Sequence, residues 1–287
     1  MKVRWLRWLG IALTGAWLAG CTTLVPAPQL PASATSAMSA SPTSATGQVE
    51  AAERRMALDA WARVLERFVD AEGEVDFAAL RAQREDLDRY VAWVGRIEAS
   101  SISGANERLA HYINSYNALS MYNVIEAGIP ATHAGLAKVR FFVLRKLLIG
   151  GERRSLYSYE NDVIRPLNEP RIHFALNCSA VSCPVLPRVP FTGASIDAEL
   201  ERETRAFFAR ASNFRIDAAS RTVWLSELLD FYPEDFVPGF APSLLAYANR
   251  YAPVAAPLDY RVRFVPYDWT VANSARRGAM KSSELRR

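Results

Sequence analysis

The chain has 287 residues, half of them hydrophobic, which is enough for a single domain of about 220 residues with a substantial core. Its 34 basic and 30 acidic residues give a net charge of +4, but three basic residues lie within the first 20, which leaves 31 basic against 30 acidic. This near-neutral balance excludes a general polyanion-binding surface, so we expect no nucleic acid partner.

The N-terminus has the pattern of a lipoprotein signal peptide over residues 1–20. Lys2, Arg4 and Arg7 precede an apolar stretch over 9–18, which ends in the small-residue box Leu-Ala-Gly-Cys at Cys21. The apolar run is too short to cross a ~30 Å hydrocarbon core as a finished helix. We therefore expect cleavage before Cys21 and lipidation of its sulfur, with an uncleaved N-terminal anchor as the alternative.

Lipidation at Cys21 predicts a membrane-anchored protein that faces the periplasm. Each buried methylene contributes about 0.8 kcal/mol, so several acyl chains on one residue make release from the bilayer very slow. Thr22 follows the cysteine, where an aspartate is the usual inner-membrane retention signal, so the outer membrane is the expected location. The expected partners are the membrane and an envelope protein, peptide or glycan.

Two low-complexity segments flank the predicted globular domain, which spans residues 49–272. Residues 21–48 are rich in Ala, Pro, Ser and Thr and predict a flexible tether. Some 26 such residues have an average reach of about 30 Å. Residues 273–287 predict a disordered basic tail that carries a concentrated positive charge: Arg276, Arg277, Lys281, Arg286 and Arg287.

The first part of the domain is predicted to be helical. Apolar residues recur every three or four positions over 49–70, 80–97 and 104–126, which predicts three amphipathic helices. Residues 75–77 read as a short extended piece between the first two helices.

The second part predicts strands interspersed with helices. The predicted strands are a Gly-Gly hairpin over 141–156, the apolar segment 171–178, a hairpin of 214–216 with 222–224, and a late strand over 261–265. The predicted helices are 159–167, 196–211 and short ones around Leu228 and Leu244. Without a regular βαβ rhythm, this order predicts an α+β domain whose helical N-terminal half packs on a small, mostly antiparallel sheet.

Two sequence blocks stand out, HYINSYNAL at 111–119 and RIHFALNCSAVSCP at 171–184. With SLYSYE at 155–160, Arg165 and YDW at 267–269, they resemble a family of bacterial and plant proteins catalogued as a domain of unknown function, number five-four-seven. The resemblance spans about residues 107–269 and implies no established reaction. The family usually has an aromatic residue at the position of His111, which argues against a catalytic role for that histidine.

Cys178 is the candidate nucleophile. It ends the predicted strand 171–178 and precedes small residues that let backbone N–H groups approach an oxyanion. The alternatives are a disulfide with Cys183, which an oxidising compartment favours, or inert buried thiols. Only two thiols and three histidines are available to a zinc site, so we expect no metal and no cofactor.

His173 is the candidate base, although strand alternation would place it and Cys178 on opposite faces unless the strand breaks. The family resemblance points to Glu160 or Asp268 as the carboxylate that orients His173. A histidine within a structural hydrogen-bond network is the alternative role, and Asp268 could equally cap a turn.

Asn114 and Asn117 share one face of the helix over 104–126, where they either line a pocket or clamp a neighbouring loop. Arg171 is a further candidate for the pocket. The alternative for Arg171 is a structural ion-pair network with Glu160 and Arg165.

These candidate residues predict a thiol-dependent hydrolase or acyl transferase that acts on a cell-envelope substrate. The order of helices before a sheet bearing Cys and His is a weak analogy to papain-like and transglutaminase-like cores. The rival function is a non-catalytic envelope binding or scaffold lipoprotein with a Cys178–Cys183 disulfide. A thiol redox factor fits less well, because the spacing is not Cys-x-x-Cys.

Overall fold

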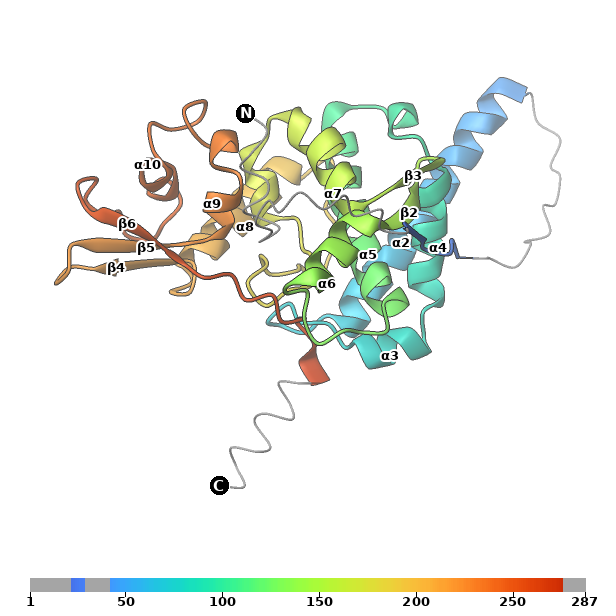
Figure 1. Cartoon of the computed structure of the whole chain (residues 1–287). Coiled ribbons are helices and arrows are strands. Elements are labelled where there is room, and N and C mark those ends of the chain that lie inside the picture. The colour runs from blue at the N-terminus through green and yellow to red at the C-terminus, as the bar shows by residue number, and fades with distance from the viewer. Residues whose placement is uncertain (1–21, 29–41, 276–287) are drawn as a thin grey trace.

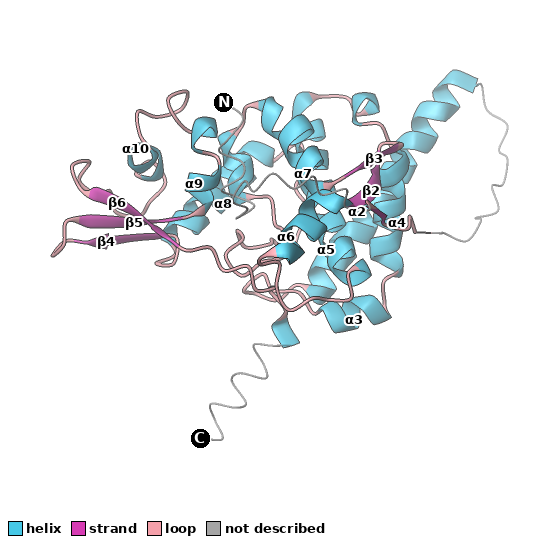
Figure 2. Cartoon of the chain, in the orientation of Figure 1, coloured by secondary structure: helices cyan, strands magenta, loops and turns pink. Residues whose placement is uncertain are grey.

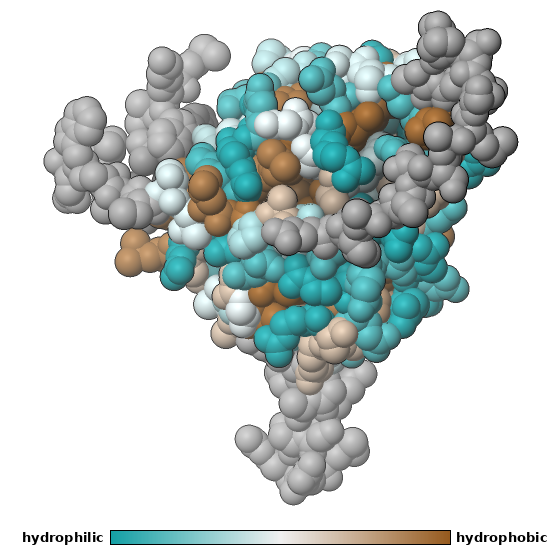
Figure 3. Space-filling model, turned by 90° about the vertical axis from the view of Figure 1, so that its right-hand side faces the viewer, coloured by the Kyte–Doolittle hydropathy of each residue, from teal (hydrophilic) through white to brown (hydrophobic). Residues whose placement is uncertain are grey.

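The computed structural model describes residues 22–28 and 42–275 (Figure 1). The predicted signal peptide, Cys21, much of the predicted tether and most of the predicted basic tail lie outside these residues. Among the described residues, no helix combines the length and apolar character that crossing a bilayer requires. The face drawn in Figure 3 intersperses hydrophilic and hydrophobic residues.

The N-terminal half is a helical layer around one central helix. Its members are α2 (Pro42–Phe68), α3 (Phe77–Ala82), α4 (Glu85–Arg96) and α5 (Ala105–Glu126). Helix α5 is buried on all sides over most of its length, which marks it as a core helix. Helices α2 and α4 pack together, with Trp61 stacked on Tyr90 at 5.5 Å between ring centroids.

The segment predicted as one helix over 80–97 is two helices in the structure. Helix α3 starts earlier because the Asp76 side chain accepts the Ala79 N–H as an N-cap. It ends at Gln83, and α4 restarts with acidic residues in its first turn, where they complement the helix dipole.

The first sheet has the order β1–β2–β3, from β1 (Thr23–Leu24), β2 (Arg145–Ile149) and β3 (Glu152–Arg154). Strands β2 and β3 form the predicted Gly-Gly hairpin, with Gly150 and Gly151 at φ 56° and 82°. Its first strand begins at Arg145, and residues 141–144, which the sequence predicts to open that strand, belong to a π turn instead. Strand β1 pairs in parallel with β2. The structure thus places residues 22–28, which the sequence assigns to the tether, against the domain.

The second sheet has the order β4–β5–β6, from β4 (Phe214–Asp217), β5 (Thr222–Ser226) and β6 (Arg261–Val265) (Figure 2). It contains the predicted hairpin and the predicted late strand. Strand β6 is parallel to β5, so each sheet mixes one parallel and one antiparallel pair. The predicted α+β class is confirmed, with the strands divided between two small mixed sheets.

The remaining helical elements are short apart from α8. They are α6 (Leu136–Val139), a π turn (Arg140–Leu144), α7 (Leu156–Tyr159), a π turn (Glu160–Ile164), 3₁₀ turns (Ala99–Ser101, Arg165–Leu167, Pro170–Phe174, Pro233–Asp235), α8 (Ile196–Ala209), α9 (Leu228–Phe231) and α10 (Leu244–Ala248).

The predicted strand over 171–178 is wrong. Pro170 opens a 3₁₀ turn over Pro170–Phe174, and the N–H groups of Ala175 and Leu176 both donate to the Ile172 carbonyl. The following backbone pairs with a side chain of α5 instead of a neighbouring strand. Strand alternation therefore does not separate His173 from Cys178.

Candidate functional site

A small cavity of about 40 Å³ gathers most of the candidate chemistry. It lies where the loop after the Pro170–Phe174 turn meets α5, α9 and the segment after β6. Its polar lining consists of Tyr116, Glu160, His173, Cys178, Cys183, Tyr232 and Tyr267. Its apolar lining consists of Phe142, Leu176, Pro184, Leu228, Phe231 and Trp269. We call it the cysteine cavity.

Both cysteines of the described chain are free thiols, and they lie beside each other in the cysteine cavity. The Sγ of Cys183 accepts the N–H of Cys178 at 3.0 Å and the hydroxyl of Tyr267 at 3.1 Å. The same hydroxyl lies 3.7 Å from the Sγ of Cys178. Ser179, at φ 63°, reverses the backbone between the two cysteines.

These contacts make the two thiols unequal. Burial raises the pKa of Cys178, and its hydrogen bond to Cys183 raises it further. Burial also raises the pKa of Cys183, but hydrogen bonds from Cys178 and Tyr267 outweigh burial and lower it overall. The thiolate is the nucleophilic form of cysteine, so the geometry favours Cys183 as the reactive sulfur where the sequence points to Cys178.

His173 also lines the cysteine cavity, and its partner is a carboxylate that the sequence analysis did not identify. Its Nε2 lies 2.7 Å from Asp235 Oδ2, and its ring stacks on Tyr232 at 4.7 Å. Burial raises the pKa of Asp235, but hydrogen bonds from His173 and Arg165 outweigh it and lower the pKa to about 2. An ionised Asp235 accepts a hydrogen bond from the Nε2–H group, which fixes the tautomer of the imidazole.

Glu160 is in the cysteine cavity but does not orient His173. It is 6% exposed and accepts the Tyr116 hydroxyl at 2.9 Å. Burial raises the pKa of Tyr116 and Tyr232 well above the ordinary value, and the neighbouring Glu160 charge adds to both shifts. Both phenols therefore stay protonated and can donate hydrogen bonds inside the cavity.

Asp268 is exposed and lies outside the lining of the cysteine cavity. Its Oδ1 accepts the Thr270 N–H, which is the turn-capping role left open by the sequence. Its neighbours Tyr267 and Trp269 line the cavity instead.

Asn114 and Asn117 of α5 both act as clamps. Asn114 donates to the Phe191 carbonyl at 2.8 Å and accepts the Phe191 N–H at 3.0 Å. Asn117 donates to the Ala175 carbonyl at 3.0 Å and accepts the Asn177 N–H at 2.7 Å. Asn117 thus holds the loop that carries both cysteines, whereas Asn114 faces a separate cavity on the α2 side.

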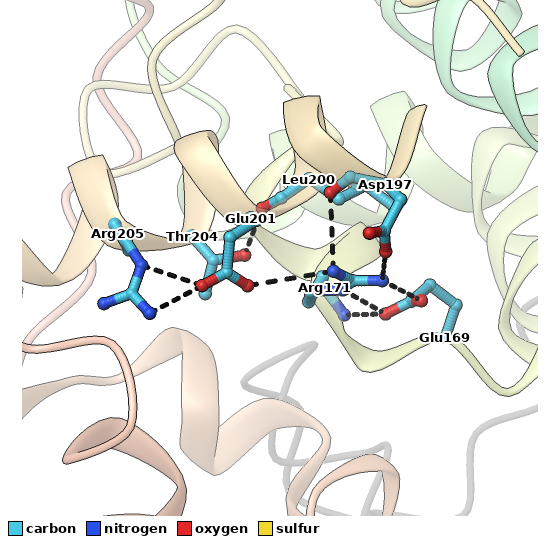
Figure 4. Close-up of polar contacts among 7 residues, drawn as sticks. All are labelled: Glu169, Arg171, Asp197, Leu200, Glu201, Thr204 and Arg205. Atoms are coloured by element: carbon cyan, nitrogen blue, oxygen red, sulfur yellow. Dashed lines mark hydrogen bonds and ion pairs between the residues drawn. The ribbon is translucent and has the colours of Figure 1, made fainter. Parts of the chain in front are cut away.

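Arg171 belongs to a surface ion-pair network and not to the cysteine cavity. Figure 4 shows its guanidinium between Glu169 and α8, where it pairs with Asp197 at 2.7 Å and Glu201 at 3.8 Å. Arg165 forms its own pairs with Glu234 and Asp235. The predicted network of Glu160, Arg165 and Arg171 is therefore divided among three separate places.

His111 is not part of the cysteine cavity. It packs edge-on against Trp93, and burial lowers its pKa to about 4. Its Nδ1 is buried without a hydrogen-bond partner among the described residues, and its ring lines the same α2-side cavity as Asn114.

A family model described as "Protein of unknown function, DUF547" matches residues 99–208. The match supports the family resemblance, and it includes both cysteines, His173 and Glu160 but neither Asp235 nor Tyr267. No curated protein and no solved structure matches the chain.

Proposed function

We propose that this chain is a lipid-anchored, thiol-dependent hydrolase or acyl transferase of the cell envelope, with Cys183 as the attacking sulfur. The observation that carries the proposal is the pair of hydrogen bonds that Cys183 Sγ receives from the Cys178 N–H and the Tyr267 hydroxyl. Hydrogen bonds to the charged form of a group favour that form, so Cys183 can be a thiolate without a general base beside it.

His173 is then the proposed residue that protonates the leaving group. Attack by the Cys183 thiolate on an acyl carbon forms a thioester and breaks the C–N or C–O bond to the leaving group, which takes a proton. The imidazole of His173 lines the same cavity, and Asp235 holds its Nε2–H, so Nδ1 is the atom that exchanges protons. In the imidazolium form Nδ1 gives its proton to the leaving group, and the neutral ring then takes a proton from the water or acceptor that releases the acyl group.

The Cys178 N–H donates to Cys183 Sγ before attack and can turn to a developing oxyanion once that sulfur has bonded to the acyl carbon, whereas the Tyr116 hydroxyl is already donated to Glu160. A volume of about 40 Å³ admits a small acyl group or the end of one side chain. Together with the signal pattern at residues 1–20 and Cys21, this favours a peptide or amide bond of the envelope as substrate.

The second candidate is a non-catalytic envelope lipoprotein in which Cys178 and Cys183 are joined. It is favoured by the contact between the two thiols and by their burial, at 9% and 7% exposed. In this case the Cys178 N–H and Tyr267 contacts are structural, and the protein binds its partner without covalent chemistry.

Alkylation of the full chain, isolated from the envelope without reductant, separates the two functions. If the chain is the proposed enzyme, iodoacetamide should modify Cys183. The labelling rate of Cys183, measured in C178A, should reach its plateau at a lower pH than the labelling rate of Cys178, measured in C183A. An acyl electrophile should add its mass to wild type and C178A but not to C183A. Quantitative recovery of a Cys178–Cys183 disulfide that resists labelling would rule out the thiolate mechanism.

A further inference from the structure

A second cavity, of about 200 Å³, lies at the C-terminal end of α5 and is lined by none of the residues of the cysteine cavity. Its charged and polar lining comes from the loop before α6, the π turn and the start of β2: Glu126, Thr132, His133, Arg140 and Arg145. We call it the arginine cavity.

Arg145 is a buried cation without a bound carboxylate. It is 6% exposed, and its Nε donates to the neutral Asn123 Oδ1 at 2.6 Å. Among the described residues, no carboxylate forms an ion pair with it. Burial lowers the pKa of Arg145, Glu126 opposes this shift, and Arg140 adds to it. A buried guanidinium is costly unless an anion accompanies it.

The remaining charges of the arginine cavity leave an excess of positive charge. Glu126 is already paired with Arg84 at 2.8 Å. Arg140 is exposed and has no ion pair or side-chain hydrogen bond within the described part of the chain. The guanidinium groups of Arg140 and Arg145 therefore line this cavity, whereas its one carboxylate, Glu126, is neutralised by Arg84, which is not part of the lining.

His133 is a second polar group of this cavity that is available to a ligand. Its side chain is fully buried, and at least one ring nitrogen has no hydrogen-bond partner among the described residues, since the Cys178 backbone can engage only the other. Its ring packs on Phe141 at 4.0 Å between centroids. Burial lowers the pKa of His133 to about 4, with a smaller opposing effect from the Cys178 backbone. Buried polar atoms are nearly always paired, so an unpaired ring nitrogen in the lining of this cavity is available to a polar ligand.

We propose that the arginine cavity binds a phosphate group, held by Arg145 and Arg140 with His133 as an additional partner. The planar guanidinium matches two oxygens of a phosphate, and such charge-assisted bonds are strong in a partly buried site. The volume exceeds that of one phosphate, so the ligand carries a further small group. The phosphate belongs either to a soluble phosphomonoester or to a phospholipid headgroup.

The position of Arg145 relative to Cys21 favours a phospholipid headgroup as the source of the phosphate. Thr23 of β1 pairs directly with Arg145 of β2, and Thr23 is the second residue after Cys21. An acylated Cys21 would therefore bring the bilayer close to the strand that carries Arg145. This choice of source rests on the proposed anchoring, whereas the phosphate site itself does not.

Thermal unfolding of the full chain in uncharged detergent tests the site, with inorganic phosphate titrated against chloride at equal ionic strength. Phosphate should raise the melting temperature of wild type, because a ligand that binds only the folded state stabilises it. We expect R140Q to bind at least about tenfold more weakly, as the loss of a charged hydrogen bond implies. The control R250Q removes an exposed cation elsewhere and should match wild type.

The proposal is overturned if phosphate and chloride act alike on wild type, or if R140Q responds to phosphate as wild type does. Because Arg140 is exposed, R140Q should fold, and its phosphate response can be measured even if R145Q does not fold. C183A should keep its phosphate response, which separates this test from that of the thiol enzyme. Glycerol 3-phosphate and dihexanoyl phosphatidylglycerol then distinguish the sources: displacement of phosphate by the lipid assigns a headgroup, and displacement by glycerol 3-phosphate alone assigns a soluble ligand.

Discussion

His173 and Asp235 are joined by a 2.7 Å hydrogen bond although 62 residues separate them in the chain. Asp235 also binds the guanidinium of Arg165 through both carboxylate oxygens. The carboxylate therefore connects a cavity-lining imidazole to the partly buried guanidinium of Arg165, and it holds the imidazole in one orientation against the Tyr232 ring.

The pKa of Asp235 predicts a specific loss of stability in acid. Its pKa in the folded state, about 2, lies below the ordinary value of 3.8, so its contribution is fully present above pH 4 and is lost as the pH falls towards 2. The difference corresponds to about 2 kcal/mol. Urea unfolding between pH 7 and pH 2 should show this decline in wild type and a shallower one in D235N. D259N, which removes a carboxylate of an exposed ion pair, should retain the wild-type slope.

The Tyr267 hydroxyl should control the reactivity of Cys183. Y267F removes one of the donors to the Cys183 sulfur, and a hydrogen bond to a charged group contributes about 1.5–3 kcal/mol. We therefore expect the pKa of Cys183 to rise by about 1–2 units in Y267F. The pH dependence of iodoacetamide labelling, followed by mass spectrometry in a C178A background, measures this shift.

The matched control for this prediction is Y260F, since Tyr260 is outside the cysteine cavity. An unchanged labelling profile in Y267F would mean that the phenol does not stabilise the thiolate.

The parts of the fold that local sequence determines were predictable. The Gly150-Gly151 pair supplies the positive φ of a tight hairpin, and the turn forms where the glycines stand. Likewise, the block that holds His173, Cys178 and Cys183 brings all three to one cavity.

The errors have long-range causes. The backbone of Ala175 and Asn177 pairs with Asn117, about 60 residues earlier, so an apolar segment that looks like a strand is a turn followed by a clamped loop. The Asp235 contact to His173 is equally distant, and no spacing rule identifies it. The preference for Cys183 over Cys178 depends on Tyr267, 84 residues further on.

Asn117 should be essential for the geometry of the cysteine loop. It is 2% exposed, and N117A removes both of its hydrogen bonds and leaves the Asn177 N–H and the Ala175 carbonyl unpaired in the interior. Each buried polar group without a partner costs about 1–3 kcal/mol, so we expect a loss of about 2–5 kcal/mol in the free energy of unfolding. N106A, at an exposed position of the same helix, should lose less than about 0.5 kcal/mol. Equal melting of the two variants would contradict the clamp.

Docking of residues 22–28 should be measurable at Val25. Its side chain is 1% exposed, its N–H donates to the Lys146 carbonyl at 2.9 Å, and the next residue's carbonyl accepts the Tyr122 hydroxyl. V25A should weaken this contact by about 1–2 kcal/mol, because it removes buried apolar surface. Hydrogen exchange at the Val25 amide should then be at least about fivefold faster than in wild type.

L24A is the control for V25A, since Leu24 is 61% exposed and should leave the exchange rate unchanged. Wild-type exchange at Val25 as fast as in an unstructured peptide would show that the segment is a free tether. If the segment is docked, its pairing with the domain begins at Thr23, two residues after Cys21. A lipid on Cys21 would then hold the domain against the bilayer, whereas a free tether of this composition would let it stand off by about 30 Å.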